Sequence, residues 1–194
     1  MSAPRFFVAL TLLVGAIAPG FAVAETVIGI LRDGPQARVM IPQSAIEAEV
    51  AKLTADEFDV RFPADKSLEG DWTLEGARAV FDRQLADPDV DIVLCLGMLV
   101  CHVAGDHPGL NKPVIAPIVV DPELQSFPFA DGASGKRNLV YITNLHSVDD
   151  DLRDFAAATS FKKLASLVDQ PTIDAFQSFL EQKVAAVEED LGIQ

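Results

Sequence analysis

Cys95, Cys101 and His102 are the side chains whose types and spacing come closest to a reactive or metal-binding group. Five residues separate the cysteines, which excludes the two-residue spacing of haem attachment and of redox C-x-x-C motifs. A disulfide between Cys95 and Cys101 stays open, because it requires Cα atoms within about 7 Å. Two separate buried thiols are the alternative. His102, His107 and His146 do not fall at metal-ligand spacing, so we expect no metal site.

Residues 132–136 (GASGK) resemble a phosphate-binding loop only in composition. Such a loop needs four residues between the glycines, Ser or Thr after the lysine, and a preceding strand. Here Arg137 follows the lysine, and a flexible loop is the better interpretation. The chain has no GxSxG elbow and no HExxH helix, and its 29 acidic residues single out no acid–base pair. We therefore expect a non-enzymatic protein without a cofactor.

A third group of residues directly follows the apolar runs of the chain. Its members are Arg32, Asp33, Gly34, Gly97, Met98 and Asp121. The carboxyl ends of parallel strands meet at one edge of a sheet, where open α/β proteins bind ligands. Glycine allows close backbone approach, helix amides attract anions, and Arg32 suits a carboxylate. We expect a small organic ligand at this edge; the alternative is a surface turn in which Arg32 and Asp33 form an ion pair.

Alternating segments of the chain must position these residues. Strands are predicted by the apolar or alternating patterns of residues 26–31, 57–62, 92–96, 113–120 and 139–143. Helices are predicted for residues 46–53 after Pro42, for 73–85 with Thr73 as N-cap, for 98–104, and for 149–160 with Ser147 as N-cap. This alternation predicts an α/β fold with a doubly wound, mostly parallel sheet of the Rossmann or flavodoxin type.

The pattern restarts near the end of the chain. Residues 161–169 (FKKLASLVD) predict a further strand, and Pro171 predicts the start of a helix that ends at Gly192. Its apolar stripe consists of Ile173, Phe176, Leu180, Val184, Val187 and Leu191. We interpret residues 25–160 as a first lobe and 161–194 as the first βα unit of an incomplete second lobe. An exposed helix face and strand edge predict a homodimer through the incomplete lobe, or instability.

The charge and the amino terminus bear on partners and location. Acidic residues number 29 against 15 basic ones, and the net charge of −14 argues against a nucleic-acid partner. Residues 6–18 form an uncharged, mostly apolar run that is too short for a bilayer core of about 30 Å. The small-x-small site at 22–24 then predicts a signal peptide cleaved after Ala24, and a periplasmic protein. A retained membrane anchor is the alternative.

Four blocks of the chain carry a family resemblance. They are TVIGILRDGP (26–35), VDIVLCLG (90–97), KPVIAPIVVDPELQ (112–125) and NLVYITN (138–144). With FKKLASLVDQP (161–171), they resemble the type 1 periplasmic substrate-binding proteins of ABC transporters. They are most similar to the group whose domain also precedes TolC-like outer-membrane channels in longer chains. Members have two lobes that close on a ligand, whereas this chain stops about one βα unit into the second.

The resemblance implies an exported, non-enzymatic binding module like the substrate-binding component of an ABC transporter. It holds a small organic ligand at the carboxyl ends of the strands. An ABC permease or an outer-membrane efflux component is the implied protein partner. One alternative is an interaction module of such an assembly, with a vestigial ligand site. Another is a secreted hydrolase on a flavodoxin-like sheet, for which no motif is present.

Overall fold

A computed structural model describes residues 25–35, 43–55, 57–123, 125, 127–143, 148–159, 161–165 and 167–192. The predicted signal peptide (1–24), the predicted helix start at Pro42 and the predicted N-cap Ser147 lie outside these residues. Among the helices that are described, none has the length and apolar character needed to cross a membrane.

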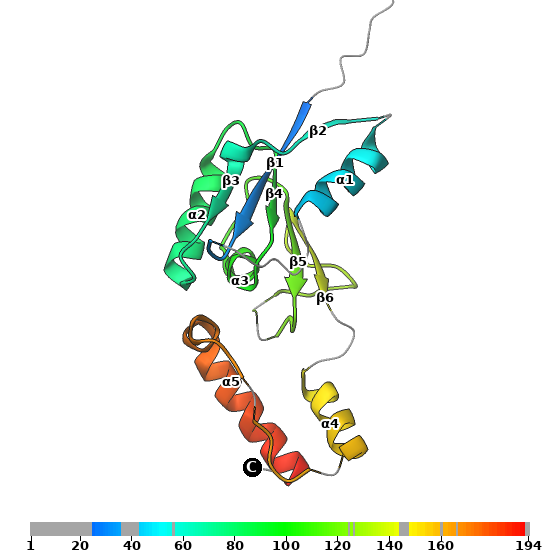
Figure 1. Cartoon of the computed structure of the whole chain (residues 1–194), viewed down its shortest axis with the longest axis vertical. Coiled ribbons are helices and arrows are strands. Elements are labelled where there is room, and N and C mark those ends of the chain that lie inside the picture. Colours follow the sequence, from blue (N-terminus) through cyan, green and yellow to red (C-terminus); the bar gives the residue numbers. More distant parts are fainter. Residues whose placement is uncertain are drawn as a thin grey trace, which may run out of the picture.

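The strands form one parallel sheet of order β2-β1-β4-β5-β6, in which β3 also pairs with β1 (Figure 1). Their bounds are β1 Glu25–Arg32, β2 Asp59–Arg61, β3 Ser67–Glu69, β4 Ile92–Cys95, β5 Val114–Val119 and β6 Leu139–Thr143. Every predicted strand up to residue 143 is therefore present. The order reverses between β1 and β4, because the chain moves outward from β1 and returns to its other side.

The outer strand beside β1 is interrupted, which the sequence did not predict. β2 pairs with the first part of β1, and β3 pairs with its last part. A short 3-10 turn, Ala64–Lys66, separates the two pieces and follows Pro63. Because proline has no N–H to donate to a ladder, the strand stops there. It resumes at Ser67, whose partner is Ile30.

Helices cover both faces of the sheet, as the doubly wound prediction requires. α2 (Leu74–Ala86) and α3 (Met98–Asp106) pack on one face and enclose the larger core, with Phe81 and Val100 fully buried. α1 (Gln43–Thr54) packs on the other face through Ile46, against a smaller cluster around Ile28. The predicted N-cap of α2 is confirmed, because the Thr73 hydroxyl accepts from an amide of the first turn.

α4 (Val148–Thr159) and α5 (Gln170–Leu191) lie beyond the carboxyl ends of the strands (Figure 1). α5 contacts the larger core through Phe176, which is buried, with Ala175 and Leu180 beside it. Gly192 ends the helix with φ 61°, as predicted for a left-handed C-cap. The side chains of Val184 and Leu191, two members of the predicted stripe, lie outside the described part.

The predicted strand at residues 161–169 is wrong for every residue of it that the structure describes. Residues 161–165 and 167–169 have no regular structure, and Leu167 is fully exposed at 102%. An apolar run becomes a strand only where another strand accepts its hydrogen bonds, and α4 carries the chain away from the sheet before this run begins. Asp169 instead caps α5 by accepting from the Thr172 amide at 2.9 Å. The division into a lobe of residues 25–160 and a second-lobe start at 161–194 stays a prediction.

Candidate functional site

The predicted binding residues lie at the carboxyl edge of the sheet, around the point where the strand order reverses. Arg32 ends β1, and Asp33 and Gly34 follow it. Gly97 and Met98 lie between β4 and α3, and Asp121 follows β5. The structure brings Asp33 directly against the start of α3. The other five predicted residues make contacts within the chain that the sequence did not predict.

Asp33 holds the amino-terminal end of α3. The Leu99 amide donates to Asp33 Oδ2 at 3.1 Å, and the Val100 amide donates to Oδ1 at 2.9 Å. The Asp33 side chain is nearly enclosed, since the residue is 7% exposed. A Cβ atom on Gly97 would lie 2.2 Å from Oδ1, so only glycine admits the carboxylate here. The helix amides that were expected to attract a ligand anion therefore already bind an anion of the chain itself.

The charge state of Asp33 reflects two opposed effects. Burial raises the pKa of the Asp33 carboxyl above its ordinary value, because the charged form loses water. The amides of Val100, Leu99 and Met98 favour the ionised form and offset part of this rise. The negative charge of Asp169, at the start of α5, raises the pKa further. The carboxylate that follows β1 and the one that caps α5 thus interact across this edge.

Gly34 and Arg32 are both engaged by neighbouring residues. The ring of Trp72 covers Gly34 so closely that a Cβ there would lie 2.5 Å from Nε1. Trp72 is held by its amide, which donates to the Asp33 carbonyl at 2.8 Å, and has a φ of 67°. Arg32 Nη1 donates to Ser67 Oγ at 3.1 Å and lies 3.3 Å from Glu69 Oε1. The alternative of an ion pair between Arg32 and Asp33 is therefore wrong, because Arg32 pairs with Glu69 instead.

Gln125 also lies at this edge, and the sequence did not predict it. It is fully buried, and its Oε1 accepts from the Val120 amide at 2.6 Å. Its Nε2 donates to the carbonyls of Ile118 at 3.2 Å and Met98 at 3.3 Å. Gln125 therefore ties the segment after β5 to the start of α3. Nothing in the local sequence indicates this role, because the amide contacts backbone groups of two different elements.

Asp121 and α5 complete the surroundings of the edge. Asp121 is buried, and its Oδ1 accepts from the Glu123 amide at 2.9 Å. The Phe176 ring of α5 meets the His102 ring of α3 edge-on, with centroids 4.9 Å apart. His102 Nδ1 lies 3.0 Å from the Gln125 carbonyl. Residues next to β1, α3, β5 and α5 therefore converge on the carboxyl edge.

The cysteines and the GASGK segment have structural roles. Cys95 and Cys101 are buried free thiols, and burial raises the pKa of Cys101 to about 12 and that of Cys95 well above its ordinary value. Such thiols hold their protons and are poor nucleophiles. Lys136 Nζ donates to the carbonyls of Ala104, Gly105 and His107 at the end of α3. Its amine is thus committed to the chain rather than offered to a phosphate.

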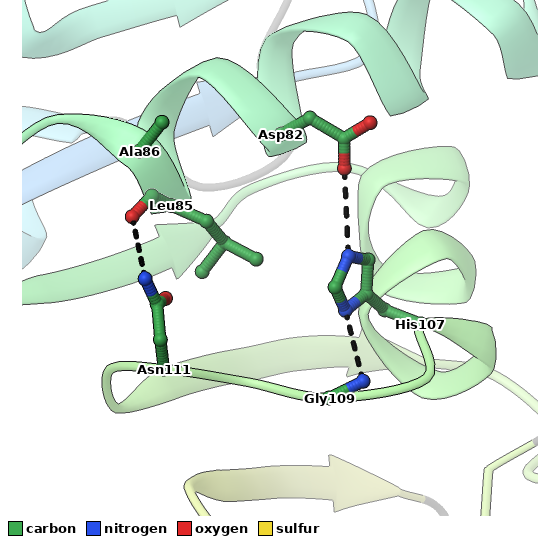
Figure 2. Close-up of a pocket in the computed structure, with 6 residues that line it drawn as sticks. All are labelled: Asp82, Leu85, Ala86, His107, Gly109 and Asn111. Atoms are coloured by element: carbon green, nitrogen blue, oxygen red, sulfur yellow. Dashed lines mark hydrogen bonds and ion pairs between the residues drawn. The ribbon is translucent and has the colours of Figure 1, made fainter.

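A hollow lies beside the carboxyl-terminal ends of α2 and α3 (Figure 2). It measures about 380 Å³, and His107 and Asp82 form one wall of it, with Nε2 and Oδ1 3.5 Å apart. Nδ1 of His107 accepts from the Gly109 amide at 3.3 Å, so both ring nitrogens are engaged. Asn111 on the opposite wall donates to the Leu85 carbonyl at 3.1 Å. The described residues that line this hollow are Asp82, Leu85, Ala86, His107, Gly109 and Asn111.

Within the described ranges, no group of three or more His, Cys, Asp or Glu side chains is placed to hold a metal ion. Comparison of the chain with protein-family models, with curated proteins and with solved structures gives no match.

Proposed function

We propose that the protein is an exported, non-enzymatic binding module that resembles the substrate-binding component of an ABC transporter. The observation that carries this proposal is the convergence at the carboxyl edge. Three predicted residues lie at this edge: Asp33 after β1, Met98 at the start of α3 and Asp121 after β5. α5 lies beyond the same edge (Figure 1). That is where open α/β sheets bind small molecules.

The charges at this edge narrow the class of ligand. The amides at the start of α3 already bind Asp33, so they are not open to a ligand carboxylate or phosphate. Asp121 and Asp169 add further acidic groups at the same edge. Arg32, the cation that the sequence analysis assigned to a ligand carboxylate, is bound to Glu69. An uncharged or cationic small organic molecule therefore fits better than an anion.

In this proposal the protein acts in the periplasm after cleavage of the signal peptide behind Ala24. An ABC permease or an outer-membrane efflux component is the proposed protein partner. No nucleic acid is expected to bind, because the net charge of −14 repels phosphate backbones.

Thermal unfolding in the presence of small molecules tests the ligand proposal. A compound that binds only the folded chain raises Tm by mass action. We expect amines or neutral polar compounds to raise Tm and matched carboxylates to leave it unchanged. Asp169→Asn should shrink the shift caused by an amine, while the cap of α5 survives because asparagine also caps helices well. Asp131→Asn, in an exposed turn, is the matched control and should keep the full shift.

If no compound raises Tm, or carboxylates and amines do so equally, the ligand proposal is wrong. The second candidate function is then favoured, which is an interaction module of an ABC or outer-membrane efflux assembly with a vestigial ligand site. One observation favours it already: Asp33 and Trp72 occupy the start of α3 and the space over Gly34. Crosslinking in intact periplasm tests it. It predicts recovery of a permease or channel component from cells in which no ligand stabilises the chain.

A further inference from the structure

Trp72, the single tryptophan of the chain, lies at the carboxyl edge, in the turn between β3 and α2. It keeps 39% of its surface exposed, although tryptophan is among the residues that gain most from burial. Its φ of 67° lies in the left-handed region, which is an outlier for so bulky a residue. Neither burial nor backbone preference therefore explains a tryptophan at this position.

Hydrogen bonds hold the backbone of this turn in place. The Gly70 amide donates to the Arg32 carbonyl at 2.9 Å, and the Trp72 amide donates to the Asp33 carbonyl at 2.8 Å. These bonds continue the pairing of β1 with β3 beyond the last residue of β3. A side chain on a backbone that is already fixed loses less conformational freedom when a ligand binds to it.

One face of the Trp72 ring rests on Gly34. A Cβ atom at Gly34 would lie 2.5 Å from Nε1 of the ring and 2.6 Å from both Cδ1 and Cε2. Three neighbouring ring atoms at nearly equal distances place Gly34 over the face of the ring, because an approach in the ring plane would bring only Nε1 so close. The opposite face is directed away from Gly34, and it is the face that a ligand can contact.

Acidic side chains flank Trp72 along the chain. Glu69, Asp71 and Glu75 are all exposed. Among the described residues, only Glu69 of these three forms an ion pair, and its partner is Arg32. The surroundings of the ring therefore carry a net negative charge.

The nearest basic residues along the chain do not offset this charge. Lys66 Nζ lies 2.9 Å from Asp87 Oδ2, and Arg78 Nη2 lies 3.1 Å from Asp106 Oδ2. Each of these cations is thus balanced by a carboxylate of another segment. The field at the Trp72 ring therefore attracts a cation and repels an anion.

The electron-rich face of an indole ring attracts cations more strongly than the ring of any other side chain. A methylated ammonium group suits this contact best among organic cations, because it has few or no N–H groups to leave unsatisfied outside water. We propose that the exposed face of Trp72 binds the methylated ammonium group of an organic cation. This inference rests on the proposed function and narrows its ligand class, because Trp72 lies at the same edge as Asp33.

The fluorescence of Trp72 tests the proposal directly, because no other tryptophan contributes to the emission of the purified full chain. Tetramethylammonium, tert-butanol and pivalate have similar shapes and differ in charge. At constant ionic strength, we expect tetramethylammonium to change the emission saturably and to raise Tm. Neutral tert-butanol should bind roughly tenfold more weakly, and anionic pivalate should not bind.

Variants of Trp72 separate the ring from its surroundings, with the Tm shift caused by tetramethylammonium as the measurement. Trp72→Phe keeps a ring with a weaker attraction for cations and should reduce affinity several-fold. Trp72→Leu should abolish the shift. Trp72→Gly should abolish it too, and because glycine suits the positive φ, this variant guards against a loss caused by misfolding. Phe129→Leu, at an aromatic residue that is 71% exposed, is the matched control and should keep the full shift.

The flanking charge has its own test. Glu75→Gln should weaken the binding of tetramethylammonium several-fold, because the cation loses an attracting carboxylate. Glu57→Gln, at an exposed position before the amino end of β2, is the control and should leave the affinity unchanged.

The results distinguish failure of this inference from failure of the proposed function. Equal binding of tetramethylammonium and tert-butanol would overturn the inference, because the ring would then act only as an apolar surface. A Tm shift that survives Trp72→Leu and leaves the emission unchanged would also overturn it, and so would a shift caused by other amines but not by tetramethylammonium. In both of these cases the proposed function stands with a ligand bound elsewhere at the edge. If no compound of any charge raises Tm, both are wrong.

Discussion

The two ends of α3 are held by opposite charges that come from distant parts of the chain. At the amino-terminal end, the Asp33 carboxylate accepts from the amides of Leu99 and Val100. At the carboxyl-terminal end, the Lys136 amine donates to carbonyls that include Ala104 and Gly105. Both arrangements suit the helix dipole, which favours an anion at its start and a cation at its end.

The difference between the ends lies in what else faces them. The Asp33 end lies at the carboxyl edge, close enough to α5 for the charge of Asp169 to act on Asp33. The Lys136 end lies next to His107, whose Nε2 is 3.5 Å from Oδ1 of Asp82 in α2. Burial disfavours the charge at both ends, since the pKa of Asp33 is raised and that of Lys136 is lowered. A charge in a candidate motif can therefore be fully used by the fold, as those of Asp33 and Lys136 both are.

Removal of the amine at the Lys136 end is expected to have the largest effect. Lys136→Met keeps much of the apolar stem but leaves the last carbonyls of α3 without their donor. Each buried polar group that loses its partner costs about 1–3 kcal/mol. We expect unfolding free energy to fall by about 3 kcal/mol in urea titrations. Lys163→Met, at an exposed position, should change it by less than about 0.5 kcal/mol. Equal effects in the two variants would show that Lys136 does not hold α3.

Truncating the Asp33 side chain should lower the unfolding free energy somewhat less than Lys136→Met does. Asp33→Ala leaves the amides of Leu99 and Val100 without an acceptor, but it also removes a carboxylate whose burial is unfavourable. We expect a loss of about 2 kcal/mol. Hydrogen exchange should show faster opening in the first turn of α3 than in its last turn. Lys136→Met should reverse that order, so each variant serves as the control of the other. Uniform exchange along α3 in both would contradict the comparison.

A methyl group at the Asp33 end provides a steric test. Gly97→Ala would place Cβ 2.2 Å from Asp33 Oδ1, so the carboxylate must move. We expect a loss of about 1–2 kcal/mol, the usual cost of inserting a methyl group into a filled site. In the Asp33→Ala background the same substitution should cost much less, because the obstructing atoms are gone. A double-mutant cycle measures this coupling, and additive effects would place the strain elsewhere.

The parallel sheet and the helices that cover it could be predicted from the sequence because the signals of these elements are local. An apolar run such as 92–96 and a helical stripe such as that of α2 can be recognised without knowing any partner. Residues 161–169 carry the same local signal but have no neighbouring strand to pair with, so the strand prediction is wrong there. β3 was missed for the opposite reason. It is only three residues long, and pairing with β1 rather than its own pattern creates it.

The candidate site was predicted by position but not by role. Asp33 and Gly97 were placed correctly at strand ends, since the end of an apolar run marks the carboxyl edge. That Asp33 caps a helix 66 residues away has no local signature, because an ordinary N-cap lies next to its helix. The same applies to Lys136, whose acceptors lie about 30 residues earlier in the chain. Long-range contacts of polar groups depend on the fold and cannot be obtained from spacing.

The smallest expected effect is the pH dependence that Asp33 confers. Its folded pKa is raised above the ordinary value of 3.8, so over the interval between these values the folded chain holds a proton that the unfolded chain has lost. Unfolding free energy therefore falls as pH rises through that interval, and it levels off above the folded pKa. Asp33→Asn removes this titration and keeps an acceptor for one amide of α3.

Urea unfolding of both chains from pH 4 to 7 measures the difference. The stability of the native chain relative to Asp33→Asn should decline as pH rises and then become constant. Lys136→Met is the control, because lysine stays protonated over this interval and its loss should shift the curve without changing its slope. Asp169→Asn should move the decline to lower pH, because the Asp169 charge contributes to the raised pKa of Asp33. A relative stability that rises with pH would mean that the helix amides outweigh burial, and that the start of α3 holds the carboxylate as firmly as an ordinary anion site.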